Sequence, residues 1–302
     1  LCATITLLAN DPMQPNQNLL GRFAPSPTGP MHMGSLIAAV ASYCDIKHRG
    51  GRWLVRVDDL DPPRIAPGAS TTILQTLSAH GLHSDLPIDY QSQHTTAYNN
   101  ALNKLTPKSF FCTCTRKQLE EFAVYPGQCR NNKTPTKNAS TRILVGKNKI
   151  AFHDLILGSQ EHDLGVEYGD FIIQRKDGLT AYNLATAVDD AAEITHVVRG
   201  RDLYTTTAVQ IHLMQLLGLS PPIYAHIPVL TFADGKKLSK QNLAPALNNT
   251  IAADNLRNAF NYLGMHMPAN DGWTVQRILD WGIANWDLNK LPTQLPPFSA
   301  MT

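Results

Sequence analysis

The first eighty residues alternate between short apolar runs and amphipathic stretches, and this order constrains the fold more than any other feature. Residues 19–24 and 52–57 have the composition of short buried strands. Residues 35–49 and 69–79 carry apolar side chains at helical spacing, and glycine follows each of them. The order strand, helix, strand, helix predicts a parallel sheet with right-handed crossovers. In such a sheet, ligands bind at the carboxyl ends of the strands.

Composition limits the class of protein. The chain has 302 residues, which suggests about two domains. Its 26 Lys and Arg against 24 Asp and Glu give a net charge of +2, so no strong field indicates a nucleic-acid partner. With 43% hydrophobic residues the chain can fill a core, which excludes global disorder. No apolar run approaches the roughly 18 residues of a spanning helix, so we expect no membrane partner.

The cysteines and the N-terminal residues indicate the compartment. There are five cysteines, an odd number, and Cys112, Cys114 and Cys129 lie close together in the sequence. A disulfide framework is unusual in a chain of this length, so we predict a reducing, cytoplasmic location and one metal site. Residues 1–17 have no basic segment typical of a signal peptide, and we expect a disordered tail there.

The first candidate site is the loop between the first strand and the first helix, residues 22–35. The start of a helix presents unpaired backbone N–H groups and the positive end of its dipole, which attract phosphate. Gly29 and Gly34 allow a ligand to approach the backbone, and His32 can donate to a phosphate oxygen. On its own, a loop rich in Pro and Gly is more often an ordinary connection.

The second candidate site is the basic loop KKLSK at residues 236–240, which follows an Asp-Gly turn. Two lysines around a serine suit a mobile clamp on a polyphosphate. Short basic loops are usually only solvated, but the order and separation of the two loops are specific. They resemble the HIGH and KMSKS signatures of class I aminoacyl-tRNA synthetases, here HMGS at 32–35 and KLSKQ at 237–241.

Further motifs narrow the resemblance to the glutamyl-tRNA synthetases. They are RFAPSPTG at 22–29, RVDDLD at 56–61, TAYNLA at 180–185 and VRGRD at 198–202, and the resemblance covers roughly residues 20–250. About 60 residues follow Lys240, fewer than the anticodon-binding region of those enzymes needs. With the cysteine cluster between the motifs, the chain most resembles the glutamyl-Q tRNA(Asp) synthetase family.

This resemblance implies a function. The family is a ligase that activates glutamate with ATP and Mg²⁺ to glutamyl-adenylate. It transfers the glutamate to the queuosine base in the anticodon stem-loop of tRNA(Asp). Two alternatives remain: a truncated glutamyl-tRNA synthetase that charges a tRNA 3′ end, and an inactive tRNA-binding paralogue. We expect a monomer.

The resemblance also implies a fold. It is α/β, with a class I synthetase-type Rossmann-like parallel sheet formed by residues 18–85 and 171–235. Residues 86–170 are expected to form an inserted zinc-containing domain of the acceptor type. Within residues 171–235, residues 180–190 and 194–198 have sheet character, and residues 205–217 have the pattern of a helix. Residues 236–302 are expected to hold the KMSKS-like loop and a helical C-terminal segment.

The resemblance implies a role for individual residues of the motifs. His32, Lys237 and Lys240 are expected to be catalytic, and ATP is expected to contact His32, Gly34, Ser35 and Lys240. Glutamate is expected to contact Arg22, Ala24, Ser26, Asp58, Tyr182 and Arg199. Arginine binds a carboxylate through two parallel hydrogen bonds. Either Arg22 or Arg199 can hold the side-chain carboxylate, and the resemblance favours Arg22.

The three clustered cysteines suit zinc, which takes four ligands in a tetrahedron. No histidine lies between His94 and His153, so a nearby fourth ligand is not histidine. The resemblance places Tyr125 there, while water or a carboxylate is the alternative.

Two positions depart from the glutamyl-tRNA synthetase pattern. Asp58 stands where those enzymes usually have Glu, which holds the amino group of the substrate. Thr186 stands where discriminating glutamyl-tRNA synthetases often have Asn, and the glutamyl-Q family lacks that Asn too.

Overall fold

The computed structural model describes residues 18–238, 244–268 and 272–298. Its main sheet has the order β3-β2-β1-β9-β10-β6-β7, and all neighbours are parallel except β6 and β7. These strands are β1 (Leu20–Phe23), β2 (Arg52–Val57), β3 (Asp89–Tyr90), β6 (Lys149–Asp154), β7 (Gly158–Asp163), β9 (His196–Gly200) and β10 (Ile223–Ile227). The predicted parallel α/β fold is confirmed.

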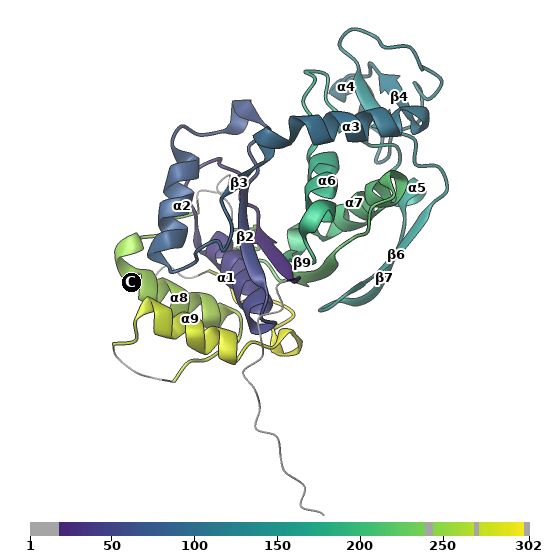
Figure 1. Ribbon diagram of the computed structural model, residues 1–302. Helices are drawn as coiled ribbons and strands as arrows, with labels where there is room; N and C mark the ends of the chain where they lie inside the picture. Colours follow the sequence, from purple (N-terminus) through teal and green to yellow (C-terminus); the bar gives the residue numbers. More distant parts are fainter. Residues whose placement is uncertain (1–17, 239–243, 269–271, 299–302) are drawn as a thin grey trace, which may run out of the picture.

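Helices cover both faces of this sheet (Figure 1). The α-helices of the described residues are α1 (Met33–His48), α2 (Ala69–Ala79), α3 (Thr95–Leu105), α4 (Arg116–Leu119), α5 (Leu164–Glu167), α6 (Tyr182–Glu193), α7 (Tyr204–Leu217), α8 (Ala252–Tyr262) and α9 (Val275–Ala284). Within the described part of the chain, none of them is long and apolar enough to cross a membrane.

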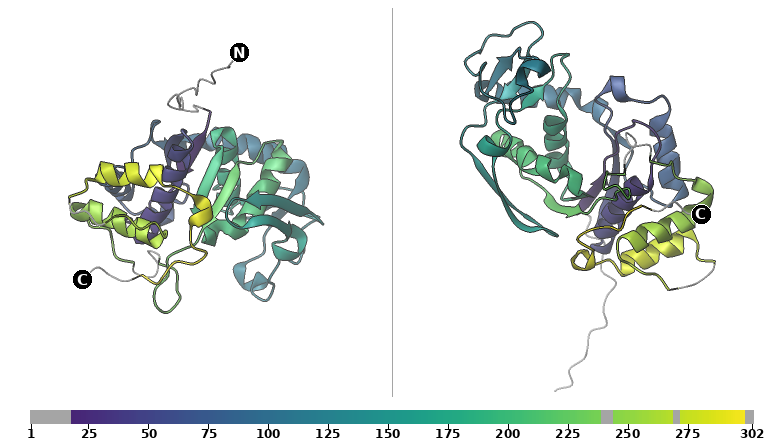
Figure 2. Two further views of the ribbon diagram at one scale, coloured as in Figure 1. Left: turned by 90° about the horizontal axis from the view of Figure 1, so that it is seen from below. Right: turned by 180° about the vertical axis from the view of Figure 1, so that it is seen from behind.

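Alternate strand residues divide the core into two halves. Val55 of β2 and Val198 of β9 pack with α1, α2, α8 and α9 on one face. Their neighbours Leu54 and Val197 pack with α3, α6 and α7 on the other face. This alternation is the period of a β-strand, and burial on both faces is what a parallel sheet requires. Views from below and behind show the same arrangement, with α8 and α9 side by side against α1 (Figure 2).

A second, antiparallel sheet has the order β4-β5-β8, made of β4 (Ser109–Cys112), β5 (Ser140–Ile143) and β8 (Ile172–Gln174). It carries its own small core around Phe110, Cys112 and Tyr125. The limits 86–170 for an inserted domain stay a prediction. Strands β6 and β7 lie inside these limits but extend the main sheet, because β6 pairs with β10.

One prediction of secondary structure was wrong. Residues 180–190 were expected to have sheet character, but α6 spans Tyr182–Glu193. The buried residues Leu184 and Ala187 recur at helical spacing, and this period outweighs the strand preference of the Thr and Val residues. The C-terminal part is helical in α8 and α9, whereas residues 236–238 and 244–248 contain no helix. The expected tail, residues 1–17, lies outside the described residues.

Candidate active site

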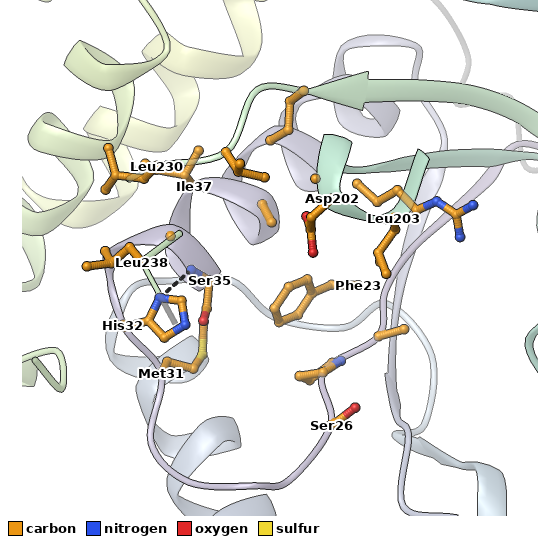
Figure 3. A pocket seen from close by; sticks show the side chains of 18 of the residues that line it. Phe23, Ser26, Met31, His32, Ser35, Ile37, Asp202, Leu203, Leu230 and Leu238 are labelled. Carbon is orange, nitrogen blue, oxygen red and sulfur yellow. Dashed lines mark hydrogen bonds between the residues drawn. The ribbon is translucent and has the colours of Figure 1, made fainter. Parts of the chain in front are cut away.

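A pocket opens at the carboxyl ends of β1 and β9. The chain builds the sheet outward from β1 on both sides, first through β2 and β3 and later through β9 and β10. Ligands bind at this place in open parallel sheets. Figure 3 shows His32, Ser35 and Ser26 around the pocket together with Asp202. The predicted residues that line it are Arg22, Ala24, Ser26, His32, Gly34, Ser35, Asp58, Tyr182, Arg199 and Lys237. Lys240 lies outside the described residues, so its predicted position stays untested.

The start of α1 forms one wall of the pocket. His32 is the N-cap residue, and its Nδ1 accepts a hydrogen bond from the backbone N–H of Ser35 at 3.2 Å (Figure 3). Nδ1 is therefore the acceptor nitrogen, and the proton of a neutral ring sits on Nε2. At Gly34 a Cβ atom would lie 3.2 Å from the His32 ring, so a side chain there would crowd the cap. This wall offers N–H donors and the positive end of the helix dipole.

The basic loop reaches the pocket through Lys237 and Leu238. Lys237 forms an ion pair with Asp202, which lies in the short turn after β9. Leu238 is buried, and its backbone N–H donates to the Leu230 carbonyl at 2.8 Å. These contacts hold the base of the loop next to the start of α1, where a Cβ atom at Gly34 would lie 3.6 Å from the carbonyl oxygen of Leu238.

Arg22 is buried and already has an anionic partner. Its Nη2 lies 3.0 Å from Oδ2 of Asp190, and Arg56 donates from Nη1 to Oδ1 of the same carboxylate at 2.8 Å. Burial raises the pKa of Asp190, but the two arginines outweigh it and hold this pKa well below its ordinary value. Arg22 therefore belongs to an internal ion pair as well as to the pocket wall.

Sequence reasoning assigned no role to Arg56, which lies in the RVDDLD motif, or to Asp190. Arg56 is 1% exposed and contacts three carboxylates, those of Asp58, Asp189 and Asp190. An arginine in the middle of a buried apolar strand was the available signal, because such a charge needs partners. Arg22, Arg56 and these three aspartates are called the arginine–aspartate cluster below.

Asp58 follows β2, at the edge of the pocket. It accepts from Nε of Arg56 at 2.9 Å, and its side chain is only 6% exposed. Burial raises the pKa of Asp58 to about 6, although the positive charge of Arg56 and its hydrogen bond to Asp58 lower this pKa. At neutral pH Asp58 is a carboxylate that is poorly solvated, and an additional cation beside it would be stabilised.

Arg199 has a different environment from Arg22. It is 3% exposed. Nε donates to Nε2 of His226 at 3.1 Å, Nη1 to Oε1 of Gln210 at 2.9 Å, and Nη2 to Oγ1 of Thr207 at 2.7 Å. Its guanidinium also lies over the ring of Tyr224, 5.3 Å from the centroid. Among the described residues, these hydrogen-bond partners include no carboxylate.

The remaining predicted contacts lie at the rim. Tyr182 is the first residue of α6 and is 40% exposed, so its phenol can reach a ligand. Thr186 is buried and does not line the pocket, and its hydroxyl has no hydrogen-bond partner among the described residues. His94, to which the sequence gave no role, bridges Asp89 and Asp189. It thus supports the arginine–aspartate cluster from behind.

A separate cluster forms in the small antiparallel sheet. The sulfur atoms of Cys112, Cys114 and Cys129 all lie within 4.8 Å of one another. The phenol oxygen of Tyr125 lies 3.6 Å from Sγ of Cys112 and accepts the Cys129 N–H at 2.9 Å. The Arg142 guanidinium lies 4.2 Å from the centroid of the Tyr125 ring. Burial raises the pKa of Cys112, but its hydrogen bonds with Tyr125 and Arg142 lower it to about 7 overall.

Comparison with known proteins finds relatives over most of the chain. Residues 18–276 match the family of class I tRNA synthetases (E and Q), catalytic domain. The chain is 45% identical over 285 residues to a glutamyl-Q tRNA(Asp) synthetase of Pseudomonas fluorescens, covering 93% of this chain and 96% of that protein. A protein of the same name from Chromobacterium violaceum is 44% identical over 290 residues, covering 91% of this chain and 97% of that one.

A solved structure supports the fold. The glutamate tRNA ligase of Elizabethkingia meningosepticum superposes with a TM-score of 0.75 at 24% identity. The match covers 94% of this chain and 68% of that one. At this identity the likeness concerns the fold alone.

Proposed function

The chain belongs to the family of glutamyl-Q tRNA(Asp) synthetases within the class I tRNA synthetases, and we propose that it activates glutamate with ATP and transfers it to the queuosine base of tRNA(Asp). It is a ligase of the aminoacyl-tRNA synthetase type. The observation that carries the proposal is the pocket itself, which joins a helix start to a carboxylate and to a buried arginine with neutral partners. These are the complements of phosphates, an ammonium group and a carboxylate.

The activation step needs positioning and charge neutralisation more than covalent help from the protein. The α-carboxylate of glutamate attacks the α-phosphate of ATP, and pyrophosphate leaves. The N–H groups at the start of α1, with His32, Gly34 and Ser35, hold the phosphates. Lys237 and Lys240 supply positive charge from the basic loop. We expect a lysine there to act mainly in the transition state.

Mg²⁺ would neutralise the phosphates when ATP is bound. The carboxylates that line the described pocket are those of Asp58 and Asp202. Each already pairs with a cation of the chain, Arg56 and Lys237 respectively. We therefore assign no protein ligand to this ion, which phosphate oxygens and water can hold.

Glutamate is a carboxylate–ammonium pair with a second carboxylate. We assign the ammonium group to Asp58, because the arginine–aspartate cluster has three carboxylates for two arginines. We assign one carboxylate to Arg199, whose partners are neutral, in preference to Arg22, which is committed to Asp190. Arg22, Ala24, Ser26 and Tyr182 complete the wall around the amino acid.

The cysteine cluster fits a structural zinc ion. With Zn–S bonds of about 2.3 Å, tetrahedral geometry separates two sulfur atoms by roughly 3.8 Å. The sulfur atoms of Cys114 and Cys129 are 3.6 Å apart, far longer than a disulfide bond. Cys112 and Tyr125 can supply the remaining ligands, and Arg142 balances the excess negative charge of three thiolates. Such an ion would hold residues 112–129 together, outside the pocket.

The acceptor is tested with three forms of tRNA(Asp). The intact form carries queuosine, the second carries guanosine in its place, and the third carries queuosine but lacks the 3′-terminal adenosine. We expect labelled glutamate on the first and third but not on the second. Labelling of the guanosine form, with loss on the shortened form, would show charging of the 3′ end instead. Labelling of none, in protein that binds tRNA, would favour the inactive paralogue.

A further inference from the structure

The carboxylate of Asp154 and the imidazole of His226 lie behind Arg199, and the activation chemistry leaves them without a role. Both side chains are 0% exposed. Asp154 ends β6 and His226 lies in β10, which stands between β6 and β9. The register aligns His226 directly with Arg199. A buried carboxylate and imidazole at this position are costly unless they are fully hydrogen-bonded.

Hydrogen bonds determine which nitrogen of His226 carries the proton. Nε of Arg199 can only donate, so Nε2 of His226, 3.1 Å away, must accept. The proton of the neutral ring is then on Nδ1, which donates to Oδ2 of Asp154 at 2.6 Å. The hydroxyl of Thr207 lies 3.0 Å from the same Nε2 and is an acceptor for Nη2 of Arg199. A continuous row runs from Asp154 through His226 to Arg199.

This row sets the direction of the guanidinium group. The guanidinium has five N–H donors, of which Nε–H, one on Nη1 and one on Nη2 are directed to His226, Gln210 and Thr207. Among the described residues, Nη1 and Nη2 each make one hydrogen bond, so each keeps an N–H that can donate to a carboxylate of the substrate. Rotation of the guanidinium would break three hydrogen bonds in a buried site.

We propose that Asp154 and His226 are positioning residues that hold Arg199 in the orientation that binds a carboxylate of the amino-acid substrate. Asp154 fixes the His226 tautomer, and His226 in turn fixes Nε of Arg199. The identity of the amino acid as glutamate rests on the proposed function, but the role of the row does not.

The substitution Asp154→Asn tests the row because the structure dictates how the new amide would sit. Oδ1 of Asp154 accepts from the backbone N–H groups of Ile156 at 3.0 Å and Leu157 at 2.9 Å. An asparagine oxygen is required in that place, so its NH₂ group faces Nδ1 of His226. Nδ1 must then become an acceptor, and the proton moves to Nε2. The resulting Nε2–H opposes Nε–H of Arg199, donor against donor.

The primary assay is pyrophosphate exchange with glutamate varied at saturating ATP. We expect Asp154→Asn to raise the KM for glutamate by about tenfold or more, the effect of losing a charge-assisted hydrogen bond. The KM for ATP should stay within about twofold, because the phosphates lie at the start of α1. His226→Leu should resemble Asp154→Asn. His226→Gln, whose oxygen can still accept from Arg199, should keep the KM for glutamate within about threefold.

Nitrogen-15 spectra of histidine-labelled protein give a readout independent of activity. The His226 signals are identified by their loss in His226→Gln. We expect the Nδ1–H tautomer in the unchanged protein and the Nε2–H tautomer in Asp154→Asn. The matched control is Asp170→Asn, another buried aspartate, which accepts from Arg130 and from a backbone N–H, lies between α5 and β8 and does not line the pocket. It should change neither the tautomer nor the KM for glutamate.

Three results would overturn the proposal. One is an unchanged KM for glutamate in both Asp154→Asn and His226→Leu. Another is equal loss in His226→Gln and His226→Leu, which would mean that packing alone matters. The third is an Nε2–H tautomer in the unchanged protein. If exchange depends on a different amino acid, the proposed function fails, and the same variants are compared with that amino acid.

Discussion

Substitution of Asp58 provides the most direct test of how the pocket binds the ammonium group of its amino acid. If Asp58 pairs with the ammonium group, Asp58→Asn should keep one acceptor oxygen but lose the charge. A charge-assisted bond in an enclosed site is worth about 1.5–3 kcal/mol, or roughly ten- to a hundredfold in the KM for glutamate. The lower end applies if Arg56, which donates to Asp58 at 2.9 Å, already screens part of the charge.

The pH dependence gives this prediction a second, sharper form. The pKa of Asp58 is raised to about 6 by burial, and only the ionised form binds an ammonium group. In the unchanged protein, kcat/KM for glutamate should therefore fall as the pH drops through about 6. One pH unit below that value, roughly one tenth of the carboxylate remains ionised, so kcat/KM should be about tenfold below its plateau. In Asp58→Asn this decline should disappear, because no group at residue 58 titrates.

The measurement is pyrophosphate exchange with glutamate varied at saturating ATP, between pH 5 and pH 8. Asp58→Glu serves as the charge-retaining control. It should keep the acid decline, and its KM shows whether the buried site accepts one more methylene group. If Asp58→Asn changes the KM for glutamate by less than about twofold and keeps the decline at low pH, the assignment is wrong. The ammonium group would then bind another carboxylate.

Three further predictions concern the loop, the metal and the core. Lys240→Ala should lower the rate of pyrophosphate exchange by about 10²–10³ while ATP binding stays measurable, and near-normal exchange would remove Lys240 from the mechanism. Elemental analysis of protein purified without added metal should find about one zinc per chain, and Tyr125→Phe should weaken its retention only if the phenol is a ligand; folded, active protein with less than about one tenth of an equivalent would contradict the zinc site. Thr186→Val removes a buried hydroxyl without a described partner, so it should raise the free energy of unfolding by about 1 kcal/mol in urea titrations and leave the KM for glutamate unchanged; a loss of stability would mean that the hydroxyl is satisfied.

Local sequence patterns determined the first strands and helices of the fold and the residues of the pocket wall. The strands β1 and β2 and the helices α1, α2 and α7 were predicted close to their limits, because each combines a clear period with a glycine or proline at its end. The motif residues could be placed together in advance, since the ends of parallel strands meet at one edge. Helix α6 was missed because its Thr and Val residues favour strands, whereas packing against α7 selected the helix.

The tertiary structure decided how the charges are shared. Arg22 and Arg199 are equivalent in sequence, because each is a motif arginine near the carboxyl end of a strand. Only the fold shows that Asp190, 168 positions away, neutralises Arg22, while His226, Gln210 and Thr207 surround Arg199 with neutral partners. Likewise, nothing in the sequence links Asp154 to His226 across 72 positions. Local sequence fixes which side chains stand at the ends of strands, but the energy of a buried charge depends on partners that only the assembled sheet brings within hydrogen-bonding distance.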